Sequence, residues 1–238
     1  MRLHVARSAG GDGVPVLLVH GFSSSHADWS ATGWTQALGR AGRAWLAPDL
    51  RGHGASEKPH EPADYRSEVF VGDLARTLDD AGAERADVVG YSLGAELALE
   101  LALAHPERVR RLLAGGIGDR RPNTAEATAI LYEHAAAGTQ PPEGPTAAMW
   151  WRASSVPGAD PVALAACLAG VSGSPPLQDF DRYPGPTLLF AGTEDEIASG
   201  VEELQRVLGA ELLRVEGRNH RTTLSAPVVK ERALAFLA

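Results

Sequence analysis

Residues 86–94 read ADVVGYSLG, and this stretch decides the fold. Ala86–Tyr91 is a short apolar run of the kind that forms a fully buried strand, and the leucines that follow at four-residue spacing predict a helix. Ser92 stands between the two, with Gly90 two residues before it and Gly94 two residues after it. A sharp strand-to-helix turn leaves no room for side chains at those two positions, and it strains the serine so that its hydroxyl projects from the turn. Ser92 is therefore predicted to be a nucleophile.

The same alternation of strands and helices runs through much of the chain. Strands are expected at 14–20, 44–47, 109–117, 187–191 and 211–215, and helices at 64–81, 93–105, 198–208 and 228–237. This pattern is typical of an α/β fold whose mostly parallel sheet carries helices on both faces. In such sheets ligands bind beyond the carboxyl ends of the strands, so the residues that follow each strand are the candidate functional residues.

A central segment departs from the alternation. It holds alanine-rich helical pieces, several prolines and two adjacent tryptophans, with no evident strand. An insertion of this length is more often a lid than a disordered loop. We expect residues 1–118 and 184–238 to form the core, and residues 119–183 to form a helical cap.

A base for the serine is expected further along the chain. A serine hydroxyl is a weak nucleophile unless a base takes its proton, and a histidine oriented by a carboxylate is a common base. Two of the later expected strands are followed by such residues, Asp195 and His220, in the chain order serine, acid, histidine. We predict that His220 takes the Ser92 proton and that Asp195 holds the imidazole. Asp119, which follows an earlier strand, is the alternative acid.

Two backbone N–H groups are candidates for an oxyanion hole. His20–Ser23 (HGFS) follows the first strong strand, and the glycine lets the backbone turn close to a substrate. The N–H of Phe22 is then expected to point at a developing oxyanion, together with the N–H of Leu93 at the start of the helix after Ser92.

The composition of the chain limits which classes of partner it can bind. The net charge of −8 argues against a nucleic acid or an anionic membrane as partner, and no apolar run approaches the ~18 residues of a transmembrane helix. Cys167 is the single cysteine, so no intramolecular disulfide can form, and its helical, alanine-rich surroundings favour a packing role. The first 13 residues lack the apolar segment of a secretory signal. We expect a cytoplasmic protein.

Taken together, these residues resemble the α/β-hydrolase superfamily, and in particular its serine hydrolases with a helical cap, such as esterases and lactonases. The resemblance covers almost the whole chain and includes Asp49–Ser56 (DLRGHGAS), which is similar to a structural turn of that family. It implies a mechanism with no cofactor and no metal, a covalent acyl-serine intermediate, and a cap over the site. A serine nucleophile also sets the chain apart from the family's epoxide hydrolases and haloalkane dehalogenases, which use an aspartate.

The expected activity is hydrolysis of a carboxylic ester or lactone, with a small molecule carrying a carbonyl group as substrate. One alternative is carbon–carbon bond hydrolysis, or a lyase reaction like that of menaquinone synthesis, at the same three residues. Those lyase substrates are polyanionic, and Glu96, one helical turn after Ser92, fits them poorly unless it is solvated or salt-bridged. Another alternative is a hydrolase homologue that binds a ligand without turnover.

The cap carries the weaker predictions. One of Trp150 and Trp151 is expected to line an apolar acyl pocket while the other packs the cap, unless both are structural, because adjacent helical residues point about 100° apart. Arg120, Arg121 and Arg152 are either ligands for a substrate carboxylate or ordinary surface residues. The composition fits a monomer or a weak homodimer equally well.

Overall fold

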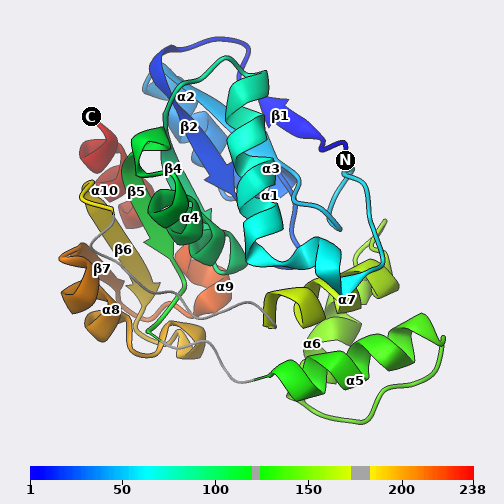
Figure 1. Cartoon of the computed structure of the whole chain (residues 1–238). Helices are drawn as coiled ribbons and strands as arrows, with labels where there is room; N and C mark the ends of the chain where they lie inside the picture. The colour runs from blue at the N-terminus through cyan, green and yellow to red at the C-terminus, as the bar shows by residue number, and fades with distance from the viewer. Residues whose placement is uncertain (120–123, 173–182) are drawn as a thin grey trace.

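A seven-stranded sheet forms the centre of the computed structural model, which describes residues 1–119, 124–172 and 183–238. The strand order is β1-β3-β2-β4-β5-β6-β7 (Figure 1). Only β1 is antiparallel to its neighbour β3, and all the other strand pairs are parallel. The strands are β1 Val5–Arg7, β2 Asp12–Val19, β3 Arg43–Pro48, β4 Ala86–Tyr91, β5 Val109–Gly115, β6 Thr187–Gly192 and β7 Glu211–Val215.

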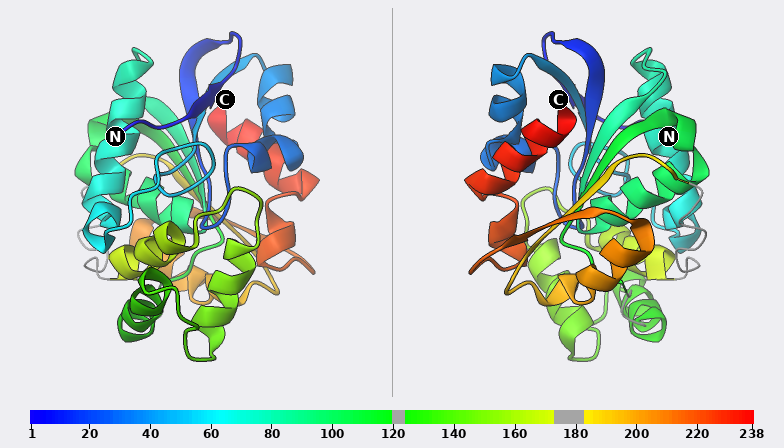
Figure 2. Two further views of the ribbon diagram at one scale, coloured as in Figure 1. Left: turned by 90° about the vertical axis from the view of Figure 1, so that its right-hand side faces the viewer. Right: turned by 90° about the vertical axis from the view of Figure 1, so that its left-hand side faces the viewer.

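Helices cover both faces of this sheet (Figure 2). On one face the buried side chains of β2 and β4 pack with α3, α4 and α8, and on the other face they pack with α1, α2 and α10. Successive strand residues alternate between the two cores: Leu17 lies in the first and Leu18 in the second. The α-helices of the core are α1 Ala27–Ala31, α2 Trp34–Arg40, α3 Ser67–Asp80, α4 Leu93–Ala104, α8 Val201–Leu208, α9 His220–Thr223 and α10 Pro227–Leu237, and the 3₁₀ helices are η1 Pro62–Tyr65, η2 Pro106–Arg108 and η4 Glu196–Ala198.

All six strands expected from the sequence are present, and the differences lie at element ends and in short elements. The helix expected at 64–81 is divided into η1 and α3 because Arg66 has an extended backbone. The helix expected from residue 198 begins only at Val201, since Gly200 adopts a left-handed conformation after η4. Four short elements, β1, α1, α2 and α9, were not among those expected from the sequence.

Three helices form the segment that we call the cap: α5 Ala125–Ala136, α6 Pro145–Ser154 and α7 Pro161–Ser172. They lie together beyond one end of the sheet (Figures 1 and 2). Their own apolar cluster contains Leu131, Trp150 and Leu164. Helix α7 also packs closely on η1, where a Cβ on Gly170 would lie 2.3 Å from the Pro62 carbonyl oxygen.

Cys167 of α7 is fully buried, as its predicted packing role requires. Among the helices of the described residues, none combines the length and the apolar character needed to cross a membrane.

Candidate active site

Ser92 occupies the turn between β4 and α4, and its φ of 55° lies in the left-handed region. The two framing glycines are required by close backbone contacts. A Cβ on Gly90 would lie 2.2 Å from the Gly94 carbonyl oxygen, and a Cβ on Gly94 would lie 2.0 Å from the carbonyl oxygen of Val19. The turn therefore has the strained geometry that the sequence predicts, and any side chain at either glycine would force β2, β4 and α4 apart.

The structure brings Asp195 and His220 together at the ends of β6 and β7. Nδ1 of His220 lies 3.0 Å from each carboxylate oxygen of Asp195. The Asp195 side chain is fully buried, and its Oδ1 also accepts hydrogen bonds from the N–H groups of Ile197 (3.1 Å) and Ala198 (3.3 Å). Because an ionised carboxylate only accepts, His220 donates from Nδ1, which leaves Nε2 as the basic nitrogen when the imidazole is neutral.

Glycines and an aromatic ring position His220 beside the serine turn. The Ser92 N–H donates to the Gly115 carbonyl at 2.8 Å, and a Cβ on the next residue, Gly116, would lie 2.9 Å from Cε1 of His220. The Tyr91 ring lies 5.2 Å from the His220 ring, and its hydroxyl donates to the His220 carbonyl. Burial raises the pKa of the Tyr91 hydroxyl, so it remains a donor.

The alternative acid, Asp119, lies elsewhere. Its carboxylate packs against the backbone of Gly200, where a Cβ would meet Oδ1. The described hydrogen bonds of the His220 Nδ1 atom go to Asp195 alone. The geometry thus favours Asp195 over Asp119 as the residue that orients His220.

The turn after β2 lies against the nucleophile. A Cβ on Gly21 would lie 3.2 Å from Cβ of Ser92 and 3.9 Å from its Oγ, so only glycine allows this approach. Neither the Phe22 N–H nor the Leu93 N–H donates a hydrogen bond to another residue within 1–119, 124–172 and 183–238. Two uncommitted donors therefore flank Ser92, as the predicted oxyanion hole requires.

His20 holds the Gly21–Phe22 peptide in place, a role that the sequence did not predict. Its Nδ1 lies 2.8 Å from the Gly21 carbonyl oxygen, and its Nε2 accepts a hydrogen bond from the N–H of Leu50 at 2.9 Å. Both bonds form together only in the neutral Nδ1–H tautomer, and burial lowers the pKa of His20 to about 4. Because the C=O and N–H of a trans peptide point in opposite directions, His20 directs the Phe22 N–H away from itself.

The Asp49–Ser56 turn contributes Asp49 to the one group of residues in the described chain that could hold a metal ion. Ligand atoms of His4, His26 and Asp49 lie within 4.8 Å of one another. The Asp49 carboxylate, however, already accepts hydrogen bonds from the His26 N–H (2.7 Å), His26 Nδ1 (2.8 Å) and the Ala55 N–H (2.8 Å). Hydrogen bonding by His26 and Ala55 thus accounts for the position of the Asp49 carboxylate.

The two tryptophans of the cap differ in environment. Trp150 is 4% exposed, packs within the cap cluster and donates its indole N–H to the Pro161 carbonyl at 2.8 Å. Trp151 is 48% exposed, with its ring 4.6 Å from that of Trp150. No ring contact or hydrogen bond of the described residues joins either ring to Asp195 or His220. Arg120 and Arg121 lie outside the described residues.

Comparison with known proteins identifies the family. The family profile for the alpha/beta hydrolase fold matches residues 14–140, which is more than half of the chain. The chain belongs to the α/β-hydrolase family. The fold and the family that the sequence predicts are therefore confirmed.

Two curated α/β-hydrolase relatives and one solved structure illustrate the range of similarity. The chain is 38% identical over 121 residues to 2-hydroxymuconate semialdehyde hydrolase of Pseudomonas sp. strain CF600, covering 50% of this chain and 42% of that protein. It is 40% identical over 115 residues to Epoxide hydrolase A of Mycobacterium tuberculosis, covering 48% and 35%. These matches thus span less than half the length of either relative.

The structural match extends further than these sequence matches. A hydrolase from Pseudomonas aeruginosa PA01 superimposes with a TM-score of 0.78 and 26% identity, over 99% of this chain and 94% of that one.

Proposed function

We propose that this α/β-hydrolase is a serine hydrolase that cleaves a carboxylic ester or lactone through an acyl-serine intermediate. The observation that carries the proposal is the hydrogen-bonded pair of buried Asp195 and partly buried His220, at the edge of the sheet where Ser92 is held in a strained turn. A buried carboxylate that fixes one tautomer of a histidine is what a general base beside a serine needs.

In the first half of the reaction, His220 Nε2 takes the proton of the Ser92 hydroxyl while Oγ attacks the substrate carbonyl carbon. The carbonyl oxygen becomes an oxyanion, which the N–H groups of Phe22 and Leu93 stabilise. Asp195 stabilises the imidazolium. The bond to the alcohol oxygen then breaks, and the alcohol leaves with the proton from His220.

In the second half, a water molecule gives a proton to His220 and attacks the acyl carbon. The same two N–H groups hold the second oxyanion, and the acid leaves as Ser92 regains its proton. Each step uses groups of this chain and water, so the proposed reaction needs no cofactor.

Carbon–carbon bond hydrolysis is the second candidate, and the similarity to 2-hydroxymuconate semialdehyde hydrolase favours it. Ser92, Asp195 and His220 would serve a ketone substrate in the same roles, with a carbanion as leaving group. The ester proposal is preferred because two N–H groups and a Ser–His–Asp set suffice for it, whereas a carbanion requires further stabilisation.

The test is turnover of short-chain p-nitrophenyl esters by the wild-type protein and by Ser92→Ala. We expect the variant to lose at least ~10³-fold in kcat/KM, as for loss of a triad member. A fluorophosphonate should add one label at Ser92 of the wild type. Labelling without ester turnover would support carbon–carbon chemistry, absence of labelling would support a binding protein, and undiminished turnover by Ser92→Ala would refute the nucleophile.

A further inference from the structure

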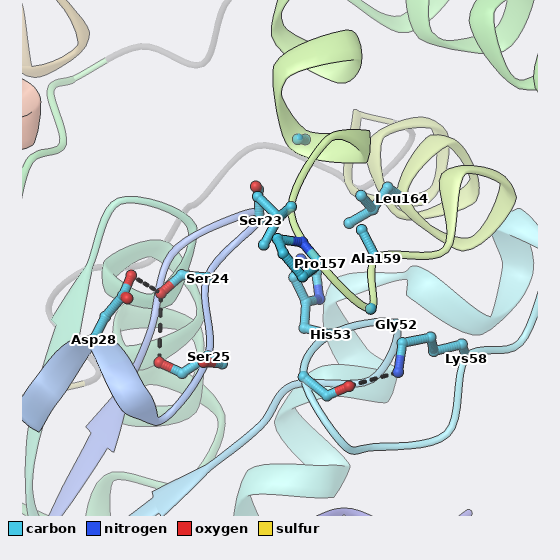
Figure 3. A pocket seen from close by; sticks show the side chains of 14 residues that line it. Ser23, Ser24, Ser25, Asp28, Gly52, His53, Lys58, Pro157, Ala159 and Leu164 are labelled. Carbon is cyan, nitrogen blue, oxygen red and sulfur yellow. Dashed lines mark hydrogen bonds between the residues drawn. The ribbon is translucent and has the colours of Figure 1, made fainter. Parts of the chain in front are cut away.

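A pocket of about 200 Å³ lies at the seam between the core and the cap, and we call it the seam pocket. Its core side includes Ser23, His53 and Lys58, and its cap side includes Pro157 and Leu164 (Figure 3). Ligand pockets commonly measure about 300–1,000 Å³. The seam pocket therefore suits a side group of a substrate rather than a whole one.

His53 lines this pocket and carries a buried polar atom without a partner among the described residues. The residue is 3% exposed, and its Nδ1 lies 2.9 Å from the Arg51 carbonyl oxygen, to which it must donate. Its Nε2 is buried and has no hydrogen-bond partner within residues 1–119, 124–172 and 183–238. Burial lowers the pKa of this imidazole to about 3, so Nε2 carries a lone pair at neutral pH. A buried acceptor without a donor is costly, because its desolvation is not repaid.

Two other polar side chains on the core side are already engaged. Ser24 donates to the Asp28 carboxylate at 2.5 Å, and Lys58 donates to the carbonyl of Gly54 at 2.6 Å (Figure 3). Lys58 also donates to the Ser56 carbonyl at 3.2 Å. Figure 3 also shows the His53 side chain extending from its loop toward the cap. A hydrogen-bond donor that enters the pocket can therefore pair the buried Nε2 of His53, and the Ser23 hydroxyl, which makes no described hydrogen bond, also lines the pocket.

The pocket is connected to the nucleophile by three consecutive residues. Gly21 packs on Ser92, Phe22 offers its N–H, and Ser23 lines the pocket with a φ of 62°. Two residues span at most ~7 Å of chain, so the Cα atoms of Gly21 and Ser23 are no further apart than this. The Phe22 ring also meets the His53 ring edge-on, with 5.6 Å between centroids. A substrate whose carbonyl binds at the Phe22 N–H can thus place a substituent in the seam pocket.

We propose that the seam pocket is a specificity subsite in which His53 Nε2 accepts a hydrogen bond from a hydroxyl group of the substrate. The preferred substrates are then hydroxylated esters or lactones whose hydroxyl lies a few bonds from the carbonyl that Ser92 attacks. This inference rests on the proposed function for the identity of the reaction, but the subsite itself can be tested without turnover.

The kinetic test uses two ester pairs in which a hydroxyl replaces a methyl group: 3-hydroxypropyl against butyl butanoate, and ethyl 3-hydroxybutanoate against ethyl 3-methylbutanoate. In the wild type, the hydroxyl member of at least one pair should have about tenfold higher kcat/KM, the value of one hydrogen bond of about 1.4 kcal/mol. His53→Asn keeps a donor for the Arg51 carbonyl but lacks the distal acceptor, so the preference should disappear. His53→Gln supplies a distal oxygen and should retain part of it. A preference that survives in His53→Asn, or none in the wild type, would overturn the proposal.

A binding test separates failure of the subsite from failure of the hydrolase proposal. Ser92→Ala protein labelled with ¹⁵N-histidine is titrated with 3-hydroxypropyl butanoate, ethyl 3-hydroxybutanoate and their methyl counterparts, and the His53 signal is assigned by its absence in His53→Gln. The Nε2 resonance should shift with at least one hydroxyl ester and not with its counterpart. A shift supports the subsite even if the wild type cleaves no ester, and no shift overturns it even if ester turnover is rapid.

Discussion

The carboxyl edge of the sheet and the cap are held together in different ways. At the edge, backbone contacts leave no space for a Cβ at Gly90 or Gly94, and hydrogen bonds to the buried Asp195 carboxylate orient His220. The cap is held by a small apolar cluster and by isolated hydrogen bonds, such as the one that the Trp150 indole N–H donates to the Pro161 carbonyl. Substitutions at the edge should therefore abolish the chemistry, whereas substitutions in the cap should change stability or substrate choice.

The largest effect is expected at the acid. Asp195→Asn should lower kcat for p-nitrophenyl butanoate by about 10³-fold, because an amide no longer holds the His220 tautomer or stabilises the imidazolium. Asp119→Asn is the matched control and should cost less than tenfold, since its carboxylate packs on Gly200. A larger loss in Asp119→Asn than in Asp195→Asn would reverse the assignment.

A smaller kinetic effect is expected at His20. His20→Leu should lower kcat by about 10²-fold with little change in KM, within the range for loss of one oxyanion-hole donor. His20→Asn retains a donor for the Gly21 carbonyl and should recover most of kcat. If His20 only filled space, His20→Leu would instead keep the higher kcat of the two variants. Circular dichroism on both variants checks the fold, and equal kcat values would contradict the positioning role.

In the cap, substitutions at the two tryptophans should have different effects on the stability of the protein. Trp150→Ala removes a buried ring and should lower the free energy of unfolding by about 3 kcal/mol, whereas the exposed Trp151→Ala should change it by less than about 0.5 kcal/mol. Urea unfolding measures both. A tenfold change in kcat/KM for Trp151→Ala, with stability unaltered, would instead place that ring in the path of the substrate.

The smallest effect concerns acid stability. Folding lowers the pKa of His20 from 6.5 to about 4 and that of His53 from 6.5 to about 3. Between pH 6.5 and these values the unfolded chain binds more protons, so the free energy of unfolding falls as the pH falls. At pH 5 each of these two histidines lowers the free energy of unfolding by on the order of 2 kcal/mol relative to its value at neutral pH. Between pH 7.5 and pH 5, the free energy of unfolding measured in urea should fall by about 2 kcal/mol less for His53→Gln than for the wild type. An equal loss would exclude His53 as a buried neutral group.

The sequence predicted the sheet and its edge well because both depend on local patterns. Apolar runs located β2 to β7, and glycine spacing located the Ser92 turn. His20 was missed because its role depends on a contact with Leu50, which no local spacing reveals. His53 was set aside as part of a structural turn, since its unpaired Nε2 becomes evident only when the cap is packed above it.

Phe22 belongs to both regions that were compared above. Its main chain carries one of the two N–H groups beside Ser92, while its ring packs against the core cluster, the cap cluster and His53. A redesign of the cap for a new substrate would press on that ring and displace the N–H attached to it. Efforts to broaden specificity should therefore meet a trade-off at this position, in which new substrates are accepted at the expense of turnover on all of them.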